Sequence, residues 1–429
     1  MKKYDKYKKS GIQWVGQIPE GWEVCKFKHF ANQITTPSKD SNKIGLENIE
    51  SATGRFVKTN SEFDGNGIHF LQNDIVYGKL RPYLKKVWMA EFEGNAVGDF
   101  FVYRCKDNSF PNFVKYLMLS EEFTDVANGS TTGAKMPRVS SSFISNLSCA
   151  LPSPDEQRDI AAYLDDKTRK IDKATEAINK QIDDLRAYRQ SLISETVTKG
   201  LNPDAPMKDS GIQWIGQIPK HWDCVKLRYL VATPLLYGAS ESGESDKPSF
   251  PRYIRITDIT ENGKLRNSGA KYLNPTIAKR YMLEPGDILF ARSGATVGKT
   301  FLFTESYPAC FAGYLIKVSC GKKLLPSFLY NFTKSGEYQN WVNSISTQAT
   351  IQNIGADKYS DLNIPLPSPD EQEAISAFLD KKTAKIDEAI KALETQRDDL
   401  ALLKNSLISE AVTGKVDVRG WNSNNETRN

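Results

Sequence analysis

Basic, amide and hydroxyl side chains, interleaved with tyrosines, gather in a few Gly-bearing stretches of this chain. Arginine can bond the edge of guanine through two parallel donors, glutamine and asparagine pair with adenine, and lysine and serine contact phosphate. The stretches lie at 72–88, 128–140, 285–299 and 346–354. A basic loop is often only a solvated one, so these loops alone leave the function open. The candidate nucleic-acid contacts are Lys79, Arg81, Tyr83, Lys85, Lys86, Lys135, Arg138, Arg252, Arg255, Arg292, Ser293, Lys299, Gln348, Thr350 and Gln352.

No arrangement of residues typical of catalysis occurs in the sequence. Gly294–Thr300 resembles a phosphate-binding loop, but it is one residue short, and the apolar Phe301–Phe303 that follows favours a strand where such a loop needs a helix. The nucleophile-elbow, zinc-protease and dinucleotide signatures are missing. The Asn/Asp-Pro-Pro-Tyr/Phe tetrapeptide of amino methyltransferases is missing too. We therefore expect a chain without catalytic residues.

Metal binding, secretion and membrane insertion are also disfavoured. The three histidines and six cysteines include no Cys-x-x-Cys and no pair at zinc spacing, so we expect no metal and reduced thiols. No apolar run reaches the roughly 18 residues of a membrane span, and none follows the basic N-terminus as in a secretion signal. We expect a cytoplasmic protein.

The net charge of +5 over 429 residues is unevenly distributed. Residues 29–150 carry no net charge, whereas 229–365 carry +4. Nucleic acid would therefore be bound through local basic patches and not through bulk charge.

The elements that must position these residues are specified twice. Ser10–Pro19 returns almost unchanged at Ser210–Pro219, and Leu151–Gln157 returns at Leu366–Gln372. The inserts between these landmarks, 29–150 and 229–365, do not resemble each other. The layout predicts two dissimilar mixed α/β modules held on two near-identical frames.

The repeat predicts seven segments. The tail that ends the chain is polar, and we expect it to be poorly ordered. The segments are a frame segment at 1–28, a first module at 29–152, a long helix at 153–199, a linker with the second frame segment at 200–228, a second module at 229–367, a second long helix at 368–415 and the tail at 416–429.

Both long helices begin with the same signal. Ser153 can cap the free N–H groups, Pro154 suits the first helical position, and Glu156 can return a bond to the cap backbone. Ser368–Glu371 repeats this pattern. The helices are expected to end near Thr198 and Thr413, each before a glycine.

An apolar residue recurs every seven positions along each helix. Such a stripe predicts that the two helices pair as an antiparallel coiled coil within one chain, although each could instead pack only on its own insert. The stripes are Leu164, Ile171, Ile178, Leu185 and Leu192, and Leu379, Ile386, Leu393, Leu400 and Leu407.

Each repeated frame contains two tryptophans. Large aromatics at these positions indicate core packing, and a docking surface for a partner remains the alternative. They are Trp14 and Trp22, and Trp214 and Trp222.

Taken together, these motifs resemble the specificity (S) subunit of type I restriction–modification enzymes. The resemblance rests on Gly11–Pro19 and its copy, on both Leu-Pro-Ser-Pro-Asp-Glu-Gln helix starts, and on Asp74–Pro82 and Gly286–Gly294, which are similar to signatures of that family's target-recognition domains. It covers nearly the whole chain.

The resemblance implies an α+β fold with two α/β target-recognition domains, separated by two long antiparallel coiled-coil helices and related by a pseudo-twofold axis. Each domain would recognise one half of a bipartite, asymmetric sequence in double-stranded DNA, and the helices would set the gap. It also implies two methyltransferase (M) and two restriction (R) subunits as partners, with S-adenosylmethionine, ATP and Mg bound to them and not to this chain. Two alternatives stay open: a coiled-coil adaptor that presents two protein-binding modules, and a fused methyltransferase, against which the missing tetrapeptide argues.

Overall fold

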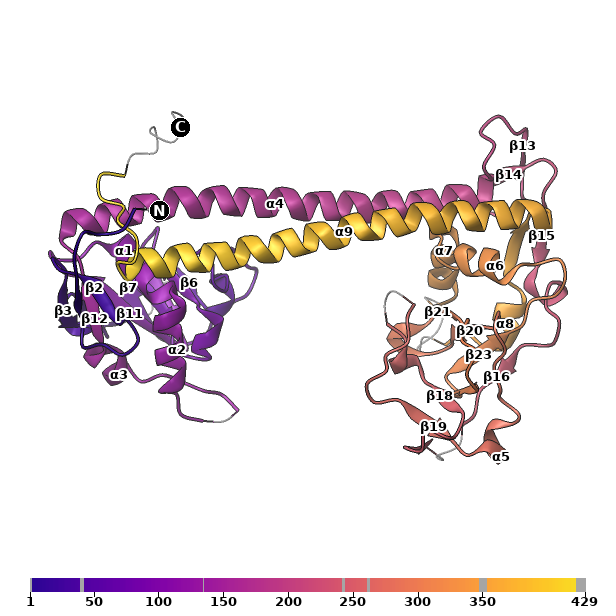
Figure 1. Ribbon diagram of the computed structural model, residues 1–429, viewed down its shortest axis with the longest axis horizontal. Helices are drawn as coiled ribbons and strands as arrows, with labels where there is room; N and C mark the ends of the chain where they lie inside the picture. The colour runs from indigo at the N-terminus through magenta and orange to yellow at the C-terminus, as the bar shows by residue number, and fades with distance from the viewer. Residues whose placement is uncertain are drawn as a thin grey trace. The chain divides into compact units, whose positions relative to one another are not determined.

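The computed structural model describes residues 2–38, 42–133, 135–240, 244–260, 263–346 and 353–421. The chain folds as two compact units. Unit 1 contains Met1–Asn179 and Glu394–Asn429, and unit 2 contains Lys180–Leu393. The division falls inside both long helices, so each unit contains a part of both (Figure 1).

The two long helices are α4, Pro154–Lys199, and α9, Pro369–Val412. Glycines with positive φ, Gly200 and Gly414, follow them as predicted. The expected reciprocal cap forms only at α9, where the Ser368 N–H donates to Glu371 Oε2 (3.2 Å) and the Glu371 N–H donates to Ser368 Oγ (3.3 Å).

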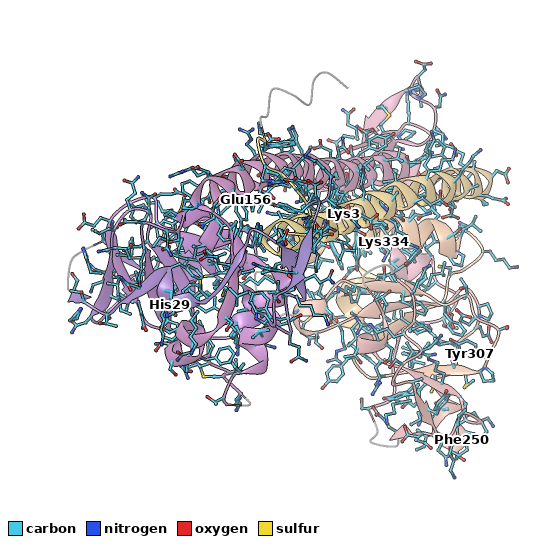
Figure 2. All side chains as sticks on the ribbon, turned by 60° about the vertical axis from the view of Figure 1, so that its left-hand side comes forward. Lys3, His29, Glu156, Phe250, Tyr307 and Lys334 are labelled. Atoms are coloured by element: carbon cyan, nitrogen blue, oxygen red, sulfur yellow. The ribbon has the colours of Figure 1, made fainter. Side chains whose placement is uncertain are left out.

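At α4 the acidic residue of the cap has a different role. The Glu156 N–H still donates to Ser153 Oγ (3.4 Å). Its carboxylate, however, accepts hydrogen bonds from Tyr4 Oη (2.6 Å) and Trp22 Nε1 (2.9 Å). Glu156, labelled in Figure 2, thus ties the beginning of α4 to the N-terminal frame segment.

The glutamine that ends the repeated helix-start motif has the same structural role in both units. Gln157 is fully buried, and its side chain accepts from the Phe110 N–H (2.7 Å) and donates to Asn108 O (3.0 Å). Gln372 makes the same bonds to Leu325 and Lys323. In both units this glutamine satisfies backbone groups of the insert and fixes it on the helix.

Within each unit the two helices pack antiparallel, because the first half of one meets the last half of the other. In unit 1, Leu164 of α4 shares a core with Leu407 of α9, and Lys404 pairs with Asp172 (2.8 Å). In unit 2, Ile193 and Val197 of α4 share a core with Ile375 and Leu379 of α9, and Arg189 pairs with Asp387 (2.9 Å). The same cores include residues of the inserts, so the two predicted packing modes occur together.

The heptad stripe is most buried in the N-terminal part of each helix, and Leu407 near the end of α9 is buried as well. Four members are only partly buried: Leu185, Leu192, Leu393 and Leu400. The buried members are Leu164, Ile171, Ile178, Leu379, Ile386 and Leu407.

In the part of unit 1 that the structure describes, the strands form four small sheets, accompanied by three short α-helices. The sheets, in strand order, are β1 (Tyr7–Lys9) with β2 (Gln17–Pro19); β12 (Ser148–Leu151) with β3 (Glu23–Lys26); β4 (Ala31–Ile34), β11 (Phe100–Cys105), β8 (Ile75–Gly78) and β9 (Val87–Met89); and β5 (Pro37–Ser38), β7 (Gly67–Phe70), β10 (Gly94–Val97) and β6 (Lys43–Ile44). The helices are α1 (Pro111–Leu119), α2 (Glu121–Gly129) and α3 (Ser141–Asn146).

Unit 2 repeats this plan. Its sheets are β13 (Met207–Asp209) with β14 (Gln217–Pro219); β15 (Asp223–Lys226) with β24 (Asn363–Leu366); β16 (Leu236–Tyr237), β23 (Leu315–Val318), β20 (Ile288–Ala291) and β21 (Thr300–Leu302); and β17 (Glu244–Ser245), β19 (Lys271–Leu273), β18 (Arg252–Ile254) and β22 (Ala309–Phe311). Its short helices are α5 (Pro275–Ala278), α6 (Pro326–Phe332), α7 (Gly336–Ser346) and α8 (Ala356–Ser360).

The two units differ in the fourth sheet. In both, a strand pairs parallel to a later one, β6 with β10 and β18 with β22. A further strand joins each pair at a different place. In unit 1, β7 pairs with β10, the later strand of the parallel pair, whereas in unit 2, β19 pairs with β18, the earlier one. The repeat therefore includes the frame and the main sheet, and the inserts diverge in the small sheet.

The expectation of a poorly ordered tail is wrong for residues 416–421. Val416 and Val418 are buried in the core of unit 1. The Asp417 N–H donates to Lys2 O (2.9 Å), and the Trp421 ring meets Tyr163 edge-on at 4.9 Å. Alternating valines give this segment an apolar face that the polar composition of the whole tail concealed.

Candidate nucleic-acid interface

One buried aspartate organises the main sheet of each unit. Asp74 accepts from the Leu71 N–H (2.8 Å) and from Arg104 Nη2 (2.7 Å). Its counterpart Asp287 accepts from the Glu284 N–H (2.8 Å) and pairs with Lys317 (3.4 Å). The Asp-Ile signature is thus structural: it fixes the turn before the central strand and links it to the neighbouring strand.

The central strand ends in a turn that differs between the units. Arg81 and Lys85 of unit 1 have left-handed backbone, with φ of 51° and 48°. Counting from the signature aspartates, the matching residues of unit 2 are Gly294 and Gly298, with φ of 69° and 81°. A non-glycine residue in this region is strained, and such strain concentrates at functional sites.

Arg81 is the most available basic residue of this turn. Its side chain is exposed, and among the described residues it has no hydrogen-bond or ion-pair partner. Its backbone N–H donates to Pro137 O (2.8 Å), which joins the turn to the polar loop at 128–140. Strain is thus tolerated at a residue whose side chain the fold does not use.

Two further cations of unit 1 share one carboxylate. Arg138 bonds both oxygens of Asp99 (3.1 and 3.0 Å), and Lys79 lies 3.8 Å from the same group. Arg138 is about half exposed, with 45% of its side-chain surface accessible. Asp99 lowers the local charge and orients both cations. No local pattern in the sequence indicates Asp99 as their partner, because it lies 20 residues from Lys79 and 39 from Arg138.

Two predicted contacts of unit 1 are engaged inside the fold. Lys85 is buried and pairs with Glu121 (2.5 Å). Lys86 donates to the carbonyl oxygens of Leu46 (2.7 Å) and Ile49 (2.8 Å). We therefore withdraw both, since their ammonium groups are engaged by partners within the fold. The remaining exposed or partly exposed residues, called here the unit 1 turn surface, are Lys79, Arg81, Tyr83, Lys135 and Arg138.

In unit 2, Arg252 is also structural. It is buried at 8% exposure, and its guanidinium donates to Asn267 Oδ1 (3.1 Å) and to Arg266 O. We withdraw it for the same reason.

Arg255 is held in place at the edge of a cavity. It bonds Asp258 (3.0 and 3.2 Å) and Glu244 (3.3 Å), and the hydrogen bond to Asp258 raises its pKa. About a quarter of its side chain, 27%, stays accessible.

The other predicted contacts of unit 2 lie on the turn after its central strand. The Arg292 guanidinium lies over the Tyr237 ring, 4.9 Å from its centre. Ser293 forms a β-bridge with Asn353, and Lys299 is exposed. The other three predicted contacts, Gln348, Thr350 and Gln352, lie outside the described residues.

The frame tryptophans contribute to the cores. Trp22 and Trp222 are buried at 1% exposure, and Trp14 and Trp214 are partly buried against the same clusters. Trp222 Nε1 donates to Glu371 (3.3 Å), as Trp22 does to Glu156.

The described residues contain no group of three or more His, Cys, Asp or Glu side chains that could hold a metal ion. Every helix within the described ranges is too short or too polar to span a bilayer.

Comparison with known proteins agrees with this architecture. Residues 239–395 match the family model described as type I restriction modification DNA specificity domain. A curated relative, the type I restriction enzyme MjaVIII specificity subunit of Methanocaldococcus jannaschii, is 25% identical over 95% of both chains.

Solved structures show the same fold. A chain solved in work on complex assembly and conformational transition of the type I R-M system is 18% identical, covers 94% of this chain and 99% of its own length, and has a TM-score of 0.75. The HsdS subunit from Thermoanaerobacter tengcongensis is 19% identical, covers 93% and 98%, and has a TM-score of 0.54.

Residues 239–395 thus match a DNA specificity domain, and the solved structures share the fold of two α/β modules on long helices. The chain is similar over 95% of its length to a specificity subunit of a type I restriction enzyme, and its DNA specificity domain and its fold agree with that class of non-catalytic subunit. The resemblance noted in the sequence and the mixed α/β fold with its long helices are confirmed.

Proposed function

We propose that residues 29–152 and 229–367 each recognise one half of a bipartite, asymmetric target in double-stranded DNA. The observation that supports this most directly is the turn after the central strand. It stands at the same place on two matching sheets, yet it presents Lys79 and Arg81 in unit 1 and Arg292 and Gly294 in unit 2. Like scaffolds with unlike exposed groups suit an asymmetric sequence.

The chain alone should bind DNA weakly. On the unit 1 turn surface two of the cations share Asp99, and residues 29–150 have no net charge. Few phosphates can therefore be neutralised, so affinity without partners should be low and its dependence on salt shallow.

Partner subunits would supply the chemistry. We propose that two methyltransferase subunits dock on the frames and helices and that two restriction subunits join them in the cytoplasm. S-adenosylmethionine, ATP and Mg would then belong to these partners. The helices α4 and α9 would set the gap between the two half-sites, which their unbroken lengths of 46 and 44 residues support.

Exchange of one module tests the proposal. Replacing residues 229–365 by the corresponding insert of another family member should change one half of the methylated motif, read by methylation sequencing of host DNA. The reciprocal control replaces residues 29–150 and should change the other half. If either exchange changed both halves, or neither, independent recognition by the two modules would be wrong.

A further inference from the structure

Unit 2 contains a cavity of about 560 Å³ beside the turn after β20. Its lining comes from both four-stranded sheets of the unit: Glu244 on β17, Tyr253 on β18, Arg292 directly after β20 and Tyr314 directly before β23. Arg255 adds a second cation. Its volume lies in the range of ligand-binding clefts.

Arg292 lines this cavity and has no carboxylate partner among the described residues. In unit 1 the equivalent Lys79 lies beside Asp99, but the residue of unit 2 that corresponds to Asp99 in the strand register is Tyr314, which has no carboxylate. The guanidinium is instead positioned over the Tyr237 ring and has one long hydrogen bond, to Asn353 (3.5 Å).

Stacking of this kind orients an arginine without using up its donors. A guanidinium on an aromatic face is held by cation–π attraction, and its edge keeps parallel N–H groups in a fixed geometry. That edge matches the O6 and N7 acceptors of guanine in the major groove. Arg292 is thus arranged before binding as a bidentate donor.

The remaining lining favours a base over a backbone phosphate. Glu244 is 40% exposed and would repel a phosphate, but its carboxylate can accept from an amino group of cytosine or adenine. Tyr314 is 66% exposed at the same cavity and can contact a base or sugar. Cations, a carboxylate and exposed rings together fit the polar edge of a base pair.

We propose that this cavity is the base-recognition site of the second module and that Arg292 determines specificity there by bonding guanine. The proposal rests on the function proposed above and deepens it, since it names the recognised base and the residue. Glu244 and Arg255 form the polar wall of the site.

The test uses the full chain in complex with its methyltransferase subunit and a library of random DNA duplexes. The bound fraction is sequenced for the unaltered chain, for Arg292→Ala and for Arg292→Lys. Loss of one bidentate contact should lower the preference for guanine at one position of one half-site by about 5- to 150-fold. The lysine variant keeps the charge but lacks the planar fork of donors. It should therefore lose the preference for guanine, while the salt dependence of binding stays similar.

Lys79→Ala is the matched control, because it changes the equivalent position of unit 1. The Lys79→Ala variant should not change the base preferences in the half-site that Arg292 affects. If both Arg292 variants kept every preference of the unaltered chain, or lost preference for a base other than guanine, the inference would be overturned while the proposed function stood. If the unaltered complex selected no sequence, the proposed function would fail and the inference with it.

Discussion

Replacing Arg81 by glycine should make unit 1 more stable and bind DNA less well. Arg81 has φ 51° and ψ 67°, and a left-handed conformation costs an L-residue roughly 1–2 kcal/mol. Glycine removes this strain but loses about 0.5–1 kcal/mol through the greater freedom of the unfolded chain. The exposed side chain has no partner among the described residues, so its loss should cost little. The net gain is about 0.5–1 kcal/mol, or roughly 1–4 °C in melting temperature for a unit of this size.

Lys85→Gly is the matched control with the same backbone conformation. Its φ is 48°, and the equivalent residue of unit 2 is also glycine. Here the side chain is buried and pairs with Glu121, of which 45% is exposed. Losing the packed stem and the ion pair should outweigh the strain, and we expect a net destabilisation of about 1–3 kcal/mol.

Thermal unfolding of the purified chain gives the stability, and titration of labelled duplex with the methyltransferase-bound complex between 50 and 200 mM salt gives the binding. Arg81→Gly should lower affinity and reduce the salt slope by about one. A lower melting temperature for Arg81→Gly would refute the strain argument. Unchanged affinity and salt slope would remove Arg81 from the interface.

Three further predictions concern the helices and a buried lysine. Insertion of four residues after Asn179, matched by four after Leu393, would lengthen both helices by about 6 Å, close to two base-pair steps. The gap in the methylated motif should therefore grow. An active variant with the original gap would contradict this. Leu164→Ala should destabilise unit 1 by about 2–5 kcal/mol in denaturant titrations, because Leu164 is fully buried, whereas Leu403→Ala, at 46% exposure, should change stability by less than about 0.5 kcal/mol. Burial lowers the pKa of Lys334 from 10.5 to about 8, so the unfolded chain binds the proton more tightly and the folded state is penalised in full below pH 8. Lys334→Met loses the bonds of the ammonium group to Thr300, but relative to the unaltered chain it should be most favourable at pH 7 and less favourable as the pH rises from 8 to 10.5; a stability difference independent of pH would contradict the burial argument.

The long helices could be predicted almost completely from local sequence. Ser-Pro-Asp-Glu starts, glycine stops and a seven-residue apolar period are contained within the segments themselves, and the structure begins α4 at Pro154 and ends α9 at Val412. The one local error was the return bond of Glu156. Both cap glutamates accept from a frame tryptophan, but Glu156 also accepts from Tyr4, which lies 152 residues away.

The candidate interface was predicted less well. Composition pointed to the turns after the central strands, but it could not separate an exposed cation such as Arg81 from a buried one such as Lys85, four residues further on. Lys85 is buried because α2 presents Glu121 to it, and Arg252 because its guanidinium is held by Asn267 and Arg266. These partners come from other segments, and no local pattern indicates them.

By itself, the sequence determined the duplicated frame, the two helices and the absence of a recognisable catalytic motif, because repeats, caps and heptads are properties of neighbouring residues. Only the tertiary structure decided which basic groups remain available. Asp99 draws Lys79 and Arg138 together from different segments of unit 1, whereas Tyr314 at the corresponding position of unit 2 offers no carboxylate, and Arg292 lies over the ring of Tyr237. The energy of a charge depends on what surrounds it within a few ångströms, and chain folding brings those neighbours from far along the sequence.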